Sequence, residues 1–399
     1  MGVVCMSIVV AAVASSPPGA LTLADVLERV RAQAPTLADA RAAVGDARAR
    51  LRGASPWLAE NPQLDAAAGR RSGTDHRDLD VGVSQAFEIA GQRGLRVTAA
   101  RAGLERAEAA LELAERAARA EAATAFYRLL HAQERLALAK RSEDVASRVM
   151  EAARKRYDAG DIAALDLNLA TIALGRARAE VASVEADRVA RDADLRTMLG
   201  MRWEEPLAVS GDLRQRVSID EASVRTSGAA RPELVAASAE RREAEAELKL
   251  GQRALWPALG VTGRYTREEG TPVAWAGLSL SLPIFKRGQE DTGAAAARVQ
   301  RARATSDMAR LQVETRTESA LAAHHLRESA RRTFEDLVLP GVEDNDALAQ
   351  RSFEVGELGL AELLLVRREG LEARQAHLDA LLAAALNDVE LLARAGGLR

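Results

Sequence analysis

The sequence Tyr-Asp-Ala-Gly-Asp at residues 157–161 decides the fold, because it recurs as Phe-Glu-Val-Gly-Glu at residues 353–357. The aromatic, acidic, small, glycine and acidic residues keep their order at a shift of 196 residues. At the same shift Asp166 maps onto Glu362. A repeat at such a fixed distance indicates that one supersecondary unit occurs twice. We therefore predict a duplicated chain.

The two copies are expected at residues 20–204 and 231–396, with a polar linker at 205–230. Residues 1–19 contain an apolar run, an Ala-x-Ala pattern and then Pro-Pro-Gly, which is typical of an export signal. No Lys or Arg precedes the run, and Cys5 within it is expected to be discarded with the signal. This single cysteine excludes a disulfide framework and does not decide the compartment.

Each copy contains two short stretches in which apolar and polar residues alternate, as in a half-buried strand. Leu79, Val81 and Val83, for example, alternate with small or polar neighbours. The pattern predicts β-hairpins at about 62–88 and 258–283, each with one apolar and one polar face. A soluble sheet would cover its apolar face with helices. A membrane barrel would expose it to lipid, but four strands cannot close one, since about eight are needed.

Aromatic residues favour the membrane alternative. Trp57 and Trp256 precede the first strand of each hairpin, and Phe87 and Phe285 follow the second. All four are expected at the sheet end opposite the turns, as in the interfacial girdle of a membrane barrel. After the first twenty residues no apolar run reaches the length of a spanning helix, so any spanning part would be a barrel.

Long helices follow each hairpin. Residues 93–157 contain no proline, and over about 90 Å of helix their apolar and small residues repeat every seven positions. The members of this row are Leu104, Leu111, Ala118, Ala125, Ala132, Ala139, Ala146 and Ala153. Alanine in such a seam allows close side-by-side packing. Further helices are predicted at 163–203, 287–353 with a break at Pro340 and Gly341, and 360–395.

Composition agrees with long helices and excludes several functions. Hydrophobic residues make up 48% and charged residues 28%, but aromatic residues only 3%. A net charge of −3 offers no basic field, so no nucleic-acid partner is expected. No nucleophile motif or phosphate loop occurs, and we expect neither an enzyme nor a cofactor. His324, His325 and Glu328 are spaced as metal ligands, but a solvated helix face explains them better.

The plan of hairpin, long helix, Tyr/Phe-x-x-Gly turn and return helix, occurring twice, resembles the outer-membrane efflux (TolC-like) family. The similarity is strongest at residues 156–160 with Asp166, at 279–285, and at 87–94, where the exit from the second strand resembles the heavy-metal branch of resistance-nodulation-division pumps. The resemblance implies a mainly α protein with a small β part. Three chains would form a twelve-stranded outer-membrane barrel, continued by an α-helical barrel in the periplasm of a Gram-negative bacterium.

The resemblance also implies partners: an inner-membrane pump, and a periplasmic adaptor protein that docks at the far turns. The expected docking residues are Arg156, Tyr157, Gly160, Phe353 and Gly356. The second turn has Ser352 and Phe353 in place of Arg156 and Tyr157, which leaves open whether both turns bind equally.

Asp166 and Glu362 lie six residues after their glycines, at the start of the return helices. Threefold symmetry would bring three copies of each acid to one level, where they would attract cations at the channel entrance. Alternatively, they are ordinary first-turn acids favoured by the helix dipole.

We therefore predict the exit duct of a tripartite efflux pump that exports metal cations. A drug or polypeptide channel of the same family is the main alternative. An adaptor protein would have a single helical hairpin within β domains, and a coiled-coil scaffold would need no amphipathic hairpins.

Overall fold

The computed structural model describes residues 19–70, 77–215, 219–226, 231–253, 256–268, 271–285 and 287–398. Apart from residue 19, the predicted export signal lies outside these ranges, as does the first hairpin turn at 72–76. The chain forms two compact units. Unit 1 takes its residues from Met1–Thr36, Glu115–Ser227 and Arg316–Arg399, and unit 2 from Leu37–Ala114 and Gly228–Thr315. Each unit therefore combines segments from both halves of the duplicated sequence.

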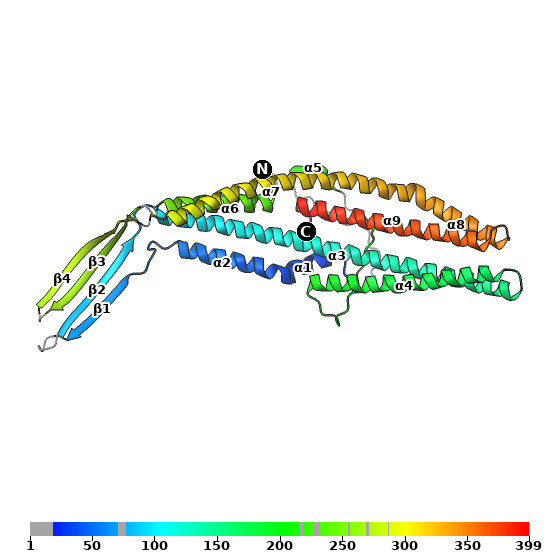
Figure 1. Cartoon of the computed structure of the whole chain (residues 1–399), viewed down its shortest axis with the longest axis horizontal. Helices are drawn as coiled ribbons and strands as arrows, with labels where there is room; N and C mark the ends of the chain where they lie inside the picture. Colours follow the sequence, from blue (N-terminus) through cyan, green and yellow to red (C-terminus); the bar gives the residue numbers. More distant parts are fainter. Residues whose placement is uncertain are drawn as a thin grey trace. The chain divides into compact units, whose positions relative to one another are not determined.

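Unit 2 contains a four-stranded antiparallel sheet in the order β1-β2-β3-β4 (Figure 1). Its strands are β1 (Gln63–Arg70), β2 (Arg77–Phe87), β3 (Ala258–Glu268) and β4 (Thr271–Ser281). The pairing of β2 with β3 joins the two hairpins into one sheet. Within this sheet β1 and β4 are the edge strands.

The strand register gives the sheet one apolar and one polar face, as the alternating sequence predicted. Leu64 lies opposite Val83, and Val83 lies opposite Gly263. Every second residue of each strand therefore contributes its side chain to the same face of the sheet. The apolar face carries Leu64, Ala66, Ala68, Leu79, Val81, Val83, Phe87, Leu259, Val261, Tyr265, Ala274, Ala276, Leu278 and Leu280. Many of these side chains are exposed, Leu278 by 77%, and none of the main contacts among the described elements joins a helix to the sheet.

The helices of unit 2 pack through small residues. They are η1 with α2 (Pro35–Leu37 and Ala38–Ala54, of which Pro35 and Thr36 belong to unit 1), the first part of α3 (Gln92–Asp158), α6 (Pro232–Arg253) and the first part of α7 (Gln289–Thr333). Their buried clusters consist of Val44, Ala47 and Ala107, and of Ala244, Val299 and Ala302. Ion pairs between Arg106 and Glu243 and between Arg242 and Glu105, both at 2.7 Å, join α3 to α6.

Unit 1 contains α1 (Leu23–Gln33), the rest of α3, α4 (Ala164–Leu199), α5 (Glu221–Thr226), the end of α7, α8 (Leu339–Glu354) and α9 (Leu360–Ala395). The seven-residue seam predicted in α3 is confirmed over most of its length by the burial of Ala118, Ala125, Ala132, Ala139 and Ala153. Short α5 lies in the segment predicted as a polar linker, and its Val224 is buried against Ala320, Leu321 and Leu391.

A π-helical turn at Phe334–Val338 connects α7 to α8 without a break. There the N–H of Leu339 donates to the carbonyl of Phe334, five residues earlier. Pro340 has no N–H to donate and its ring crowds the carbonyl four residues back, so the preceding turn widens. The predicted break at Pro340 and Gly341 is therefore wrong, because the helix continues through both residues. The wider turn before the proline accommodates it. No helix of the described residues is long and apolar enough to cross a lipid bilayer.

Candidate functional site

The α3–α4 and α8–α9 turns lie at the same end of unit 1 (Figure 1). Their backbones share the same geometry. Gly160 and Gly356 both have φ of 82°. In the first turn the N–H of Gly160 donates to Tyr157 O at 2.9 Å, and that of Asp161 donates to Arg156 O at 2.8 Å. A positive φ at the residue after a helix, with these two hydrogen bonds, is the Schellman end that glycine favours.

The second turn repeats these two bonds at the equivalent positions. The N–H of Gly356 donates to Phe353 O at 3.2 Å, and that of Glu357 donates to Ser352 O at 2.9 Å. The turn motif found in the sequence is thus a repeat of backbone geometry, although the side chains at the two positions differ.

The two turns contact each other through Arg156 and Phe353. The guanidinium carbon of Arg156 lies 4.9 Å from the centre of the Phe353 ring, within the range of a cation–π interaction. Beneath this pair Ala153, Ala170 and Leu360 form a buried cluster that Phe353 helps to cover. The sequence singled out both residues but contained no signal for their contact, since it joins positions in different halves of the chain.

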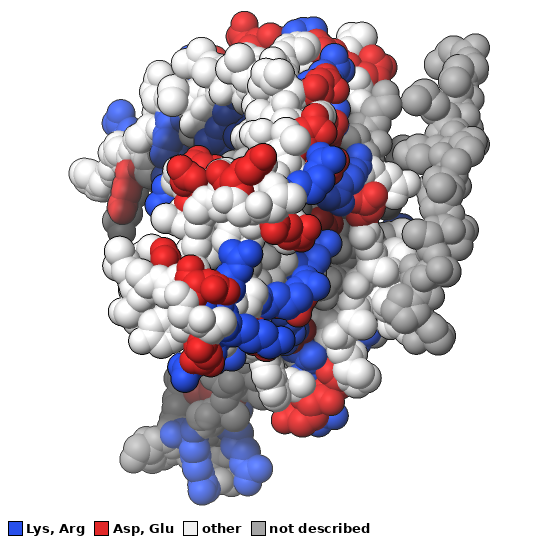
Figure 2. All heavy atoms as spheres, turned by 90° about the vertical axis from the view of Figure 1, so that its right-hand side faces the viewer, with Lys and Arg blue, Asp and Glu red and all other residues white. Residues whose placement is uncertain are grey.

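The two turn aromatics are therefore not equivalent. Phe353 is half-buried under Arg156, whereas Tyr157 is 40% exposed. Viewed from the end of the helical turns, acidic and basic side chains are interspersed (Figure 2). An approaching protein would meet an accessible tyrosine and mixed charge on this surface.

The predicted entrance acids both lie in the first turn of their helices. Glu362 is exposed, and its Oε2 accepts a hydrogen bond of 3.1 Å from the N–H of Gly359, the N-cap residue directly before α9. Half-buried Asp166 occupies the same position in α4. The capping bond of Glu362 supports the helix-start role for that residue.

The predicted interface aromatics lie at the helix-proximal end of the sheet. Phe87 ends β2, Trp57 and Trp256 precede β1 and β3, and Phe285 follows β4. All four are exposed, Trp57 by 84% and Phe285 by 89%. The guanidinium of Arg93 lies 5.2 Å from the Trp57 ring, and its Nε donates to Ser55 O at 2.9 Å. Arg93 thereby connects the segment that leaves β2 to the segment that enters β1.

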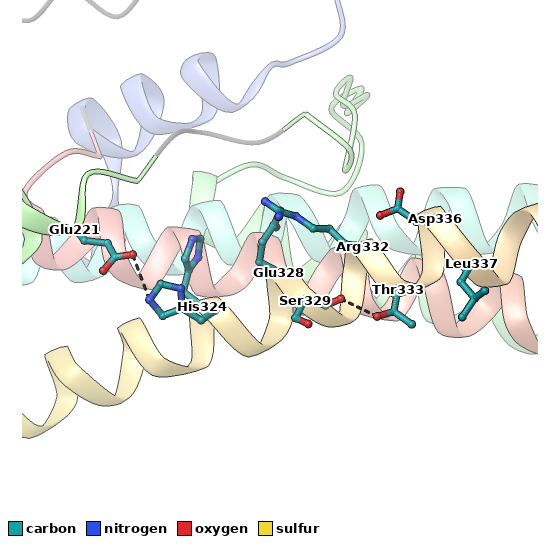
Figure 3. A pocket seen from close by; sticks show the side chains of 9 residues that line it. Glu221, His324, Glu328, Ser329, Arg332, Thr333, Asp336 and Leu337 are labelled. Carbon is teal, nitrogen blue, oxygen red and sulfur yellow. Dashed lines mark hydrogen bonds and ion pairs between the residues drawn. The ribbon is translucent and has the colours of Figure 1, made fainter.

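An open pocket of about 580 Å³ in unit 1 includes the histidines considered as metal ligands (Figure 3). His325 Nε2 lies 3.2 Å from Glu221 Oε1. Glu328, however, already forms ion pairs through its Oε1 with Arg331 Nη2 at 2.7 Å and with Arg332 Nε at 3.1 Å. Both arginines neutralise the carboxylate that a metal would need. Within the described ranges, no group of three or more His, Cys, Asp and Glu side chains is arranged to hold a metal ion.

A duplicated chain with an amphipathic sheet, long alanine-seamed helices and paired Schellman turns is an outer-membrane efflux channel in architecture. Comparison with known protein families agrees with this architecture. The chain belongs to the outer membrane efflux protein family, whose sequence model matches residues 26–201 and 224–397. Members of this family are the outer-membrane channels of tripartite efflux pumps, which also contain an adaptor and an inner-membrane pump. The protein is accordingly a transport channel of the Gram-negative outer membrane that extends into the periplasm, and not an enzyme.

Among similar proteins, the cobalt-zinc-cadmium resistance protein CzcC of Cupriavidus metallidurans is 26% identical over 80% of this chain and 77% of its own. The nickel-cobalt-cadmium resistance protein NccC of Alcaligenes xylosoxydans xylosoxydans is 29% identical over 77% and 70%, respectively. In fold, the outer membrane protein VceC of Vibrio cholerae matches with a TM-score of 0.80 at 17% identity, covering 94% of this chain and 96% of that one.

Proposed function

We propose that this channel exports metal cations, as the exit duct of a heavy-metal efflux pump. The supporting observation is its similarity over most of both lengths to proteins named for cobalt, zinc, cadmium and nickel resistance. The Phe87 to Gly94 segment, similar to the heavy-metal branch, supports the same substrate class. Positive φ at Gly91 and the contacts of Arg93 shape this segment.

Deletion of the gene tests the substrate class. We expect loss of tolerance to cobalt, zinc, cadmium or copper, with unchanged tolerance to hydrophobic drugs, and recovery when the wild-type gene is restored. Loss of drug tolerance alone would favour the drug channel, and loss of secretion of a polypeptide would favour polypeptide export.

We propose that the working channel is a homotrimer in which β1 of one chain pairs with β4 of the next. Edge strands leave unpaired N–H and C=O groups, and a barrel in lipid must have none. Three copies of four strands make twelve, and the apolar face would then contact lipid, with Trp57, Trp256, Phe87 and Phe285 at the periplasmic interface. Mass measurement in detergent should give three chains. A stable monomer would contradict the barrel.

We propose that the adaptor docks at Arg156, Tyr157, Gly160, Phe353 and Gly356. The open space around both glycines allows another backbone to approach closely. Replacing Gly160 or Gly356 by valine should abolish adaptor crosslinking while trimers still reach the outer membrane. Gly175→Val, on the exposed side of α4, is the matched control. Loss of the trimers themselves would show that these glycines serve only as helix ends.

For Asp166 and Glu362 we propose an acidic ring at the entrance. In planar bilayers, Asp166→Asn combined with Glu362→Asn should weaken block by divalent cations and reduce cation selectivity. Unchanged block and selectivity in an assembled trimer would leave both acids as helix-start residues.

A further inference from the structure

One level of the polar face of the sheet carries two large side chains, those of Arg264 and Trp275. The two residues lie directly opposite each other in the β3–β4 pair, and Arg264 lies opposite Gly82 in the β2–β3 pair. In the β1–β2 pair Gly82 lies opposite Asp65. A single row of residues therefore crosses all four strands, and each of its members belongs to the polar face.

Most other residues of this face have short side chains. They include Ala67 and Gly69 in β1, Ser84 and Ala86 in β2, Gly260 and Thr262 in β3, and Gly277 and Ser279 in β4. The longer side chains of Gln63 and Glu268 lie at strand ends. Arg264 and Trp275 are therefore the largest side chains in the middle of the face, and their positions determine how much space remains in front of the sheet.

A glycine allows Arg264 to lie flat against β2. A Cβ atom on Gly82 would lie only 3.2 Å from Arg264 Nε and 3.5 Å from its Nη2. Nε is shielded from solvent and has no hydrogen-bond partner among the described residues. The guanidinium reaches Asp80, where Nη1 donates to Oδ2 at 2.9 Å. The charge of Arg264 is thus paired with an acid of the same face.

Trp275 folds over a second glycine. A Cβ atom on Gly277 would lie 2.9 Å from Trp275 Cζ3, closer than side chains normally approach. The centre of the Trp275 ring lies 5.9 Å from the guanidinium carbon of Arg264, within the range of a cation–π interaction. Arg264 on β3 is therefore held by Asp80 on β2 and Trp275 on β4, and the glycines supply the space in which both large side chains lie along the sheet.

The reach of Arg264 is large relative to the barrel proposed above. Twelve strands about 4.8 Å apart, tilted by about 40°, give a circumference of about 75 Å and a radius of about 12 Å. An extended arginine side chain spans roughly half of this radius. Threefold symmetry brings three copies of the row to one level. Three arginines that extended inward would therefore narrow the duct and repel cations.

We propose that Arg264 is a permeation-determining residue of the barrel, held against the wall by Gly82, Asp80 and Trp275. In this position Asp80 neutralises its charge, and the duct stays open to hydrated metal cations. This inference rests on the proposed trimer, in which the polar face of the sheet lines the duct.

The test measures full-length trimers in planar bilayers. Gly82→Val fills the space beneath Arg264 without changing the net charge, and should direct the guanidinium into the duct. We expect the ratio of cation to anion permeability to fall by roughly threefold, because three charges then face the permeating ions. Tripolyphosphate added on the barrel side should block the variant but not the wild type, since guanidinium groups bind phosphate strongly.

The matched control is Gly69→Val, on the same face, where an added Cβ would touch nothing within 4 Å. This control should keep wild-type selectivity and resist block. Gly82→Val combined with Arg264→Gln should also resist block, because the guanidinium is gone. Wild-type behaviour of Gly82→Val, equal changes in Gly69→Val, or block that persists without Arg264 would each overturn the proposal.

If Gly82→Val does not assemble, Asp80→Asn provides the comparison, because it releases Arg264 without adding volume. Asp80→Asn should become sensitive to tripolyphosphate. Asp65→Asn, which removes an acid from the same face, should not. Equal behaviour of these two variants would overturn the role of Arg264.

Failure of the proposed orientation is distinguishable through Ser84→Cys on the polar face. Modification of this cysteine by a bulky, charged thiol reagent should reduce the current if the face lines the duct, and wild-type channels treated with the same reagent are the control. An unchanged current would contradict the orientation itself, whatever the Arg264 variants do.

Discussion

At the scale of single residues, glycines of this chain have opposite roles according to their backbone. Gly160 has φ of 82°, where most side chains other than that of asparagine are strained, whereas Gly175 lies within α4. An added Cβ would touch nothing within 4 Å at either position, so the backbone alone decides the effect. We expect Gly160→Ala to destabilise the protein by about 1 kcal/mol and Gly175→Ala to stabilise it by about 0.5–1 kcal/mol.

Thermal unfolding of both variants in detergent measures this difference. Gly160→Asn should lie near the wild type, because asparagine tolerates the left-handed region. A melting temperature that changes in the same direction for Gly160→Ala and Gly175→Ala would contradict the assignment.

His131 is buried in unit 1, with its Nε2 2.9 Å from Asp379 Oδ1. Burial lowers the pKa of His131; Asp379 and Asp187 oppose this shift, and Arg135 adds to it. As pH falls below about 6.5, the unfolded chain therefore takes up a proton before the folded chain does. The free energy of unfolding should decrease with falling pH between that value and the lower pKa of the folded state.

Urea unfolding at about pH 7.5 and about pH 5.5 tests this expectation. His131→Gln should reduce the loss of stability on acidification, since glutamine carries no titratable group. His325→Gln is the control, because the side chain of His325 is 61% exposed. An identical loss in the wild type and His131→Gln would exclude the proposed role of His131.

At the scale of helices, Asp346 joins α8 to α9. Its Oδ2 lies 2.7 Å from Arg374 Nη2, and its Oδ1 lies 3.6 Å from Arg367 Nη1. The side chain of Asp346 is only 14% exposed. Asp346→Ala would leave two partly buried cations without their anion. We expect a loss of about 1–2 kcal/mol, after allowance for the solvent around the arginines.

The exposed Asp344, two residues earlier on the same helix, provides the matched control. Asp344→Ala should change the free energy of unfolding by less than about 0.5 kcal/mol. Comparison of the two variants by urea unfolding measures the effect of the ion pairs apart from the change in helix propensity. Equal losses would show that the ion pairs add nothing to stability.

At the scale of the whole molecule, the two faces of the sheet determine whether the channel enters the membrane. Val83 lies near the middle of the apolar face and Ser84, its neighbour, on the polar face. Val83→Arg would place a charge in lipid, at a cost of about 2–4 kcal/mol near the bilayer midplane. Ser84→Arg would place the same charge in the water-filled interior.

The amount of assembled trimer in outer-membrane fractions measures this difference. We expect a large loss for Val83→Arg and nearly wild-type amounts for Ser84→Arg. The reverse order would mean that the apolar face is not directed toward lipid.

The sequence alone predicted the duplication, the two hairpins, the long helices and the family. These features depend on local patterns, namely a period of two in strands, a period of seven in the helical seam, and a glycine where the backbone needs positive φ. Family membership and the mainly α fold with its small sheet are confirmed. The repeat boundaries, docking residues, entrance acids and interface aromatics stay predictions, since they depend on partners and on assembled chains.

Only the tertiary structure decided which distant residues meet. The contact of Arg156 with Phe353, the two arginines around Asp346 and the widened turn before Pro340 join or reshape segments whose spacing in the sequence carries no signal. The same holds for the shared apolar face of the sheet. A slip of one residue between β2 and β3 would move Val261 and Tyr265 to the face opposite Val81 and Val83, so this face is a property of strand register and not of the sequence pattern alone.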